Sequence, residues 1–69
     1  MKLRTYLNFL NPAQQVIVRD VYRYHFMGSA TACIAERSLW DREILKTRNR
    51  GDEIEISLRV RPKRGIINE

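Results

Sequence analysis

The sequence predicts an α+β fold in which a small antiparallel four-stranded sheet packs on two short helices, in the order α-β-β-α-β-β. Leucines spaced three and four residues apart near the start predict the first helix. β-branched and aromatic residues between positions 15 and 27 are typical of strands, and strict alternation between positions 53 and 60 predicts a strand with one wet face. With both helices on one face, the opposite face of the sheet stays exposed to solvent.

The first helix is predicted over residues 2–10. Its apolar face is formed by leucines at helical spacing, namely Leu3, Leu7 and Leu10. Pro12 ends the helix, because proline lacks a backbone N–H and disfavours helical geometry in the residue before it. The strand-like stretch that follows exceeds the usual strand length of about 5–6 residues. The polar pair Arg19 and Asp20 is therefore predicted to turn a hairpin.

The rest of the chain predicts a second helix and a second hairpin. Ser29 or Thr31 supplies the N-cap of this helix, which continues to Arg37. Gly51 lies among Asn and Asp residues, which together supply the positive φ angles of a hairpin turn. The last strand then turns its apolar side chains toward the helices: Ile54, Ile56, Leu58 and Val60.

Length and composition allow one domain. The chain has 69 residues, 43% of them hydrophobic, and a domain of about this size buries only roughly 60% of the surface that its unfolded chain exposes. We assign residues 1–61 to a single α+β domain and residues 62–69 to a basic, flexible C-terminal tail. One cysteine excludes an internal disulfide, and no apolar stretch resembles a membrane span or a signal peptide. These features predict a soluble, cytoplasmic protein.

The net charge of +5 is concentrated near the C-terminus. Clustered cations bind nucleic acids because they displace counterions condensed on the phosphates. Two further arginines lie in the predicted first hairpin. The candidate contacts to nucleic acid or to another partner are therefore Arg19, Arg23, Arg59, Arg61, Lys63 and Arg64. The alternative is a solvated tail that keeps the protein soluble.

Aromatic and cationic residues alternate between positions 22 and 26. On an exposed sheet face, such residues can stack on bases and hold a nucleic-acid backbone. If the aromatic side chains point to the core instead, the Arg and His side chains point outward beside Arg19. They then form a basic strip without stacking platforms. The sequence leaves both registers open.

No pattern in the sequence indicates catalysis. His25 is the only histidine and Cys33 the only cysteine, so neither a His-rich nor a Cys-rich metal site can form. A nucleophilic cysteine also needs an orienting group and an oxyanion donor, and Cys33 is better explained as a small core residue. We therefore expect no enzyme activity, no catalytic residue, no metal, no cofactor and no small-molecule substrate.

Five short segments carry a shared pattern: residues 3–7, 16–20, 26–30, 39–44 and 54–56. Their polar and small markers are Asp20, Gly28-Ser29-Ala30 and Leu39-x-Asp41-Arg42-Glu43. The pattern resembles a family of small proteins encoded by phages and prophage-like elements of Gram-positive bacteria. The resemblance implies a phage or prophage origin and a location in the bacterial host cell, and it implies no established activity. The first hairpin departs from the family pattern, because Val21-Tyr22-Arg23-Tyr24 replaces an Asp- and Gly-rich turn.

Two functions agree with these observations. The one favoured by the sequence is a non-catalytic protein-interaction or accessory module that uses a sheet edge or the wet sheet face, with self-association as one form. The alternative is a nucleic-acid-binding protein that uses the basic C-terminal segment and a basic sheet face. Salt dependence distinguishes them, because phosphate binding weakens steeply with salt and a protein interface does so far less.

Overall fold

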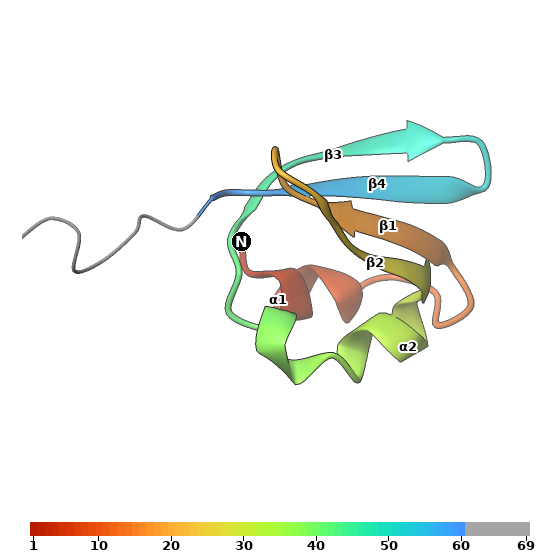
Figure 1. Ribbon diagram of the computed structural model, residues 1–69. Coiled ribbons are helices and arrows are strands. Elements are labelled where there is room, and N and C mark those ends of the chain that lie inside the picture. Colours follow the sequence, from red (N-terminus) through yellow and green to blue (C-terminus); the bar gives the residue numbers. More distant parts are fainter. Residues whose placement is uncertain (61–69) are drawn as a thin grey trace, which may run out of the picture.

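A four-stranded sheet lies on two short α-helices and one 3-10 turn in the computed structural model, which describes residues 1–60 (Figure 1). Along the chain the elements are α1 (Leu3–Leu7), β1 (Gln15–Arg19), β2 (Tyr24–Ser29), α2 (Ala30–Ile34), η1 (Arg37–Leu39), β3 (Ile44–Arg50) and β4 (Glu53–Leu58). The order of strands across the sheet is β2-β1-β4-β3. The α+β class and the order of α-helices and strands agree with the sequence prediction. The second helix, predicted to continue to Arg37, ends at Ile34, and the 3-10 turn η1 was not predicted.

The prediction of a fully antiparallel sheet is wrong, because β1 and β4 pair in parallel. Only the two hairpins, β1 with β2 and β3 with β4, are antiparallel. The chain returns along the sheet through α2 and η1, so β3 begins at the same end of the sheet as β2, and β4 runs in the direction of β1 (Figure 1). β3 is exposed at nearly every residue, as expected for an edge strand, whereas β4 is better buried and is an interior strand of the sheet.

The hydrophobic core lies between the helices and one face of the sheet (Figure 1). Its buried residues come from both helices, from η1 and from the two central strands: Leu3, Leu7, Val16, Val18, Ala30, Cys33, Leu39, Ile56 and Leu58. The alternation predicted for the last strand is confirmed for Ile56 and Leu58. Val60 differs, because it follows the end of β4 and is exposed.

The first helix is shorter than predicted. It ends at Leu7, whereas the sequence predicts a helix over residues 2–10. The backbone N–H of Leu10 donates to the carbonyl of Leu7, a spacing of three residues that is typical of the tighter 3-10 geometry at helix ends. Leu10 still packs against the core from this turn.

Two local predictions are confirmed at a helix start and at a hairpin turn. Ser29 caps α2, because its Oγ accepts a hydrogen bond from the backbone N–H of Ala32 at 3.1 Å. Gly51 lies in the two-residue loop between β3 and β4 with a φ of 65°, a left-handed conformation that glycine adopts without a steric cost.

The C-terminal part of the sequence prediction lies outside the described residues. This applies to the basic tail assigned to residues 62–69 and to Arg61 before it. Within residues 1–60, no helix combines the length and the apolar character that crossing a membrane requires.

Candidate functional site

One face of the sheet is not covered by the helices (Figure 1). Residues that align across neighbouring strands have their side chains on the same face of the sheet. Residues that align with core residues therefore face the helices, and the remaining residues face the uncovered side. Arg19, for example, aligns with Ser57, which in turn aligns with Lys46. We call this surface the open face, and it is formed by Ile17, Arg19, Tyr24, Met27, Lys46, Arg48, Arg50, Glu53, Glu55 and Ser57.

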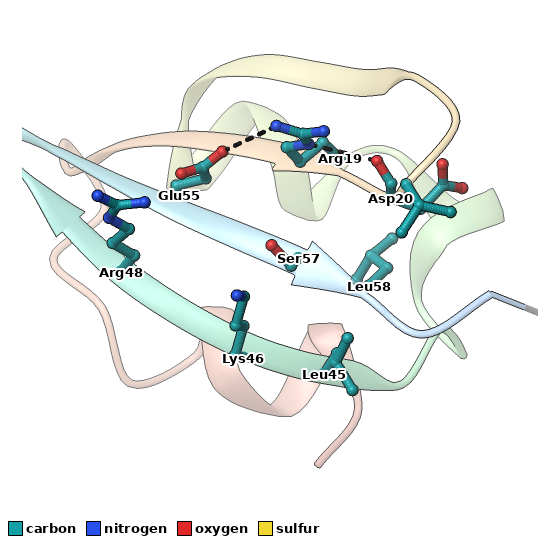
Figure 2. Close-up of a pocket in the computed structure, with 9 residues that line it drawn as sticks. Arg19, Asp20, Leu45, Lys46, Arg48, Glu55, Ser57 and Leu58 are labelled. Carbon is teal, nitrogen blue, oxygen red and sulfur yellow. Dashed lines mark hydrogen bonds and ion pairs between the residues drawn. The ribbon is translucent and has the colours of Figure 1, made fainter.

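Glu55 lies at the centre of the open face and joins arginines from both sides. Its Oε2 is 3.4 Å from Nη1 of Arg19 on β1 (Figure 2), and its Oε1 is 3.6 Å from Nη1 of Arg50 on β3. The Glu55 side chain is only 9% exposed. A carboxylate with so little access to water needs paired charges, and these two contacts hold both guanidinium groups over the sheet.

Lys46 and Arg48 carry positive charge that no carboxylate of residues 1–60 pairs with. Both side chains are exposed, and their spacing of two residues along β3 places them on the same face. Arg50 continues the row. At a rise of about 3.3 Å per residue, β3 thus presents three cations along roughly 13 Å of the sheet edge.

The aromatic residues of the first hairpin divide between the two faces. Phe26 aligns with Val18 and packs against the core, whereas Tyr24 aligns with Arg19 and is 55% exposed. Tyr22 lies in the turn and is exposed. Neither register that the sequence left open holds throughout, because the pairing of β1 with β2 shifts after Val18. The Arg19 guanidinium is 5.2 Å from the centroid of the Tyr24 ring, within the range of a cation–π contact.

A cavity of about 280 Å³ lies on the open face near the end of β4 (Figure 2). Its walls come from the turn after β1, from β3 and from the second half of β4. The lining combines three cations, two carboxylates, one hydroxyl and three apolar side chains. The lining residues are Arg19, Asp20, Val21, Leu45, Lys46, Arg48, Glu55, Ser57 and Leu58.

A buried polar cluster borders this cavity at the end of β1. The Oδ1 of Asp20 accepts hydrogen bonds from the backbone N–H groups of Tyr22 at 2.7 Å and Arg23 at 3.1 Å. Its Oδ2 is 2.7 Å from Nε2 of His25 and 3.6 Å from Nη2 of Arg42. The hydrogen bond with His25, followed by that from Tyr22, holds the pKa of Asp20 well below its usual range. This cluster fixes the turn that forms one wall of the cavity.

Three of the six predicted contact residues lie in the described part of the chain. Arg19 is on the open face as the last residue of β1, whereas the sequence predicts it in the hairpin turn. Arg23 lies in the turn between β1 and β2, where its N–H donates to the Asp20 side chain. Arg59 follows β4, and its N–H donates to the carbonyl of Glu43. The other three lie outside the described residues: Arg61, Lys63 and Arg64. The described residues therefore bring only Arg19 of this set onto the open face.

The sequence prediction missed the cations of β3. Lys46, Arg48 and Arg50 occupy every second position of a strand, which is the spacing that places side chains on one face. This signal was present in the sequence. The sequence prediction treats this stretch only as the approach to the Gly51 turn and assigns no faces to it.

Cys33 is a core residue, as predicted. It is fully buried on α2. Burial, with a smaller contribution from the charge of Glu36, raises the pKa of the Cys33 thiol to about 11. A protonated thiol without access to solvent is a poor nucleophile.

Comparisons with known proteins do not identify a relative: no protein-family model matches the chain, and neither does any curated protein or solved structure. The open face and its cavity are therefore the features that support a functional proposal.

Proposed function

We propose that this protein is a non-catalytic binding module whose open face binds single-stranded nucleic acid. The row of cations on β3 supports the proposal most directly. Lys46 and Arg48 have no carboxylate partner among residues 1–60, so their charge is available to phosphates, whose binding releases condensed counterions. The proposal reverses the order of the two functions weighed from the sequence, because the sequence prediction missed this row.

The arrangement of helices and strands favours a single strand over a duplex. Proteins that read a duplex commonly insert a helix into the major groove, but α1 and α2 have only five residues each and pack on the covered side of the sheet. Exposed sheets with aromatic side chains bind single strands, because unstacked bases can stack on them. Tyr24 offers such a ring, and the neighbouring Arg19 guanidinium offers a second planar group.

The width of the sheet allows one bound oligonucleotide to contact both the cations of β3 and the Tyr24 ring. β3 and β2 are the outer strands, with β4 and β1 between them. At about 4.8 Å between adjacent strands, the cations of β3 and the Tyr24 ring on β2 lie roughly 14 Å apart. A single-stranded oligonucleotide that crosses the open face can therefore place phosphates on the β3 cations and a base on Tyr24.

The residues after β4 carry further positive charge, which supports the same proposal. Arg59, Arg61, Lys63 and Arg64 follow this strand in the sequence and supply further cations for phosphates. From the phage-like pattern of residues 3–60, we further propose an accessory role for a phage or prophage, performed in the cytoplasm of its bacterial host.

Fluorescence anisotropy with a labelled single-stranded oligonucleotide tests the proposal. We expect binding at about 50 mM salt that weakens strongly at about 200 mM, since phosphate contacts depend on salt. The double variant Lys46→Ala/Arg48→Ala is expected to bind about tenfold more weakly at low salt, because it removes two phosphate contacts. A duplex of the same sequence is expected to bind more weakly than the single strand.

A matched control removes the same charge outside the open face. Lys2 precedes α1 and Arg37 begins η1, and both are exposed. The double variant Lys2→Ala/Arg37→Ala should bind the oligonucleotide as the unmodified protein does. Equal losses for the two double variants would mean that affinity follows net charge alone, which contradicts a site on the open face. The absence of any binding at low salt would also contradict the proposal.

Protein interaction through the β2 edge is the second candidate function. Within residues 1–60, β2 has a neighbouring strand on one side only, and its Met27 side chain is 65% exposed. An unpaired edge can accept a strand from another chain, including a second copy. Sedimentation velocity would show this self-association as a dimer that forms with rising concentration and is lost in Met27→Lys. A monomer at every concentration would exclude self-association.

A further inference from the structure

We infer that the cavity on the open face is a site for one nucleotide of the bound strand, with its phosphate held by Lys46, Arg48 and Ser57. The inference rests on the proposed function and assigns it a defined pocket. Three features support it: the size of the cavity, its unpaired cations beside paired carboxylates, and its apolar rim.

The cavity lies where the sheet departs from regular geometry. The pairing of β1 with β2 shifts register after Val18, and the pairing of β3 with β4 shifts between Ile44 and Lys46. Such irregularities bend a strand locally, change the direction of side chains, and occur often beside functional sites. The resulting space of about 280 Å³ is close to the lower limit of small-ligand sites, about 300 Å³. This size suits one nucleotide better than a longer segment.

Polar groups in the lining of the cavity can bind an anion. Lys46 and Arg48 have no ion-pair partner among residues 1–60. Ser57 is half-buried and aligned with Lys46 across the two strands, so both side chains lie on the open face (Figure 2). The oxygens of a phosphate can accept hydrogen bonds from all three residues, and bonds between charged partners are the stronger ones.

The two carboxylates that border the cavity are already engaged. Glu55 is paired with arginines on both sides, at 3.4 and 3.6 Å. Asp20 accepts hydrogen bonds from two backbone N–H groups and lies 2.7 Å from Nε2 of His25. A hard divalent cation would need carboxylate oxygens free of such partners. The cavity is therefore better suited to an anion than to a metal ion.

The apolar rim favours a nucleotide over a simple anion. Val21 and Leu45 border the cavity and are 67% and 51% exposed, whereas Leu58, which also lines it, is buried. A bare phosphate or the carboxylate of an acidic side chain would leave the two rim residues in water. The sugar and base of a nucleotide would cover them and remove apolar surface from water, which is favourable.

Chemical-shift mapping by ¹H–¹⁵N NMR with adenosine 5′-monophosphate tests the site. We expect this nucleotide to shift the amide signals of Val21, Leu45, Lys46 and Ser57. Inorganic phosphate should shift fewer of these signals, and more weakly. In Lys46→Ala, nucleotide affinity should fall about tenfold, since a hydrogen bond to a charged group is lost. Lys2→Ala changes the charge equally and should leave the titration unchanged.

Lys2 and Lys46 are both exposed, so neither substitution is expected to unfold the protein. Unchanged amide signals away from the substituted residue would show that the fold is retained. Shifts confined to residues outside the cavity would overturn the inference. Glutamate at the same concentration is the further control. If it causes the same shifts as the nucleotide, the cavity is a carboxylate site and the nucleotide assignment is wrong.

A parallel titration with a thymidine oligonucleotide separates this inference from the proposed function. If the oligonucleotide shifts Tyr24 and Arg48 but neither it nor the mononucleotide shifts Val21 or Leu45, the nucleotide site is wrong and the proposed function stands. If the mononucleotide shifts the cavity signals and the oligonucleotide does not bind, the proposed function is wrong and the cavity is a site for free nucleotides.

Discussion

The two faces of the sheet differ in composition and in what they contribute. On the covered face, Val18 and Ile56 are fully buried against the helices. The next residues of the same strands, Arg19 and Ser57, lie on the open face and remain accessible. One face thus forms the hydrophobic core, and the other carries the proposed binding surface. Stability and binding can therefore be altered separately, by substituting neighbouring residues of one strand.

The largest expected effect comes from substitution on the covered face. Ile56→Ala is expected to lower the free energy of unfolding by roughly 2–5 kcal/mol, because it leaves a cavity in the core. A core this small supplies only about 3–5 kcal/mol, so much of this variant should be unfolded. Ser57→Ala should change stability by about 0.5 kcal/mol or less. Urea unfolding followed by circular dichroism measures both, and equal losses would contradict the assignment of the two faces.

Asp20 is expected to make the fold sensitive to acid. Its pKa lies well below the usual range because of the hydrogen bonds with His25 and the turn backbone. The unfolded state therefore binds the proton more tightly, and the stability from this group is present above about pH 3.9, the ordinary pKa, and is lost as the pH falls further.

Urea midpoints between about pH 2 and pH 6 test this expectation. They should fall toward acid in the unmodified protein and fall less steeply in Asp20→Asn, which should also be less stable at neutral pH. Asp41→Asn is the control, because the Asp41 side chain is 81% exposed; this variant should keep the original pH dependence. Equal slopes for the unmodified protein and Asp20→Asn would contradict the role of the buried cluster.

A smaller effect is expected from the aromatic part of the open face. Tyr24→Ala should weaken binding of the single-stranded oligonucleotide about tenfold, since stacking of a base on an aromatic side chain contributes about 1–3 kcal/mol. Tyr22→Ala is a matched control, because Tyr22 is also exposed but lies in the turn. Both variants should unfold at the urea concentration of the unmodified protein. If the two lose affinity equally, stacking on Tyr24 is not the cause.

The features that the sequence predicted correctly are local ones. The alternation around Ile56 defined the last strand, Gly51 marked its turn, and Ser29 marked the start of α2. Each depends on residues within a few positions of one another, where periodicity, turn chemistry and capping act directly. The same local reasoning placed Cys33 in the core.

The features that the sequence did not predict depend on contacts between distant segments. The parallel pairing of β1 with β4 follows from the return of the chain through α2 and η1, and neither strand carries a local signal for its partner. The sequence predicts Asp20 as a turn residue and as a marker of the family pattern; its contact with Arg42, which joins two distant segments, exists only in the folded chain. The open face likewise forms only when β1 pairs with β4, which places Arg19 beside Ser57 and Ile17 beside Glu55.

The salt dependence of oligonucleotide binding tests the central claim most directly. For a single strand, each phosphate contact contributes about −0.7 to the slope of log affinity against log salt concentration. The slope of Lys46→Ala/Arg48→Ala should therefore be shallower by about 1.4 than that of the unmodified protein, and Lys2→Ala/Arg37→Ala should keep the original slope. An unchanged slope in Lys46→Ala/Arg48→Ala would mean that the phosphates bind elsewhere, and would contradict the assignment of the open face as the binding surface.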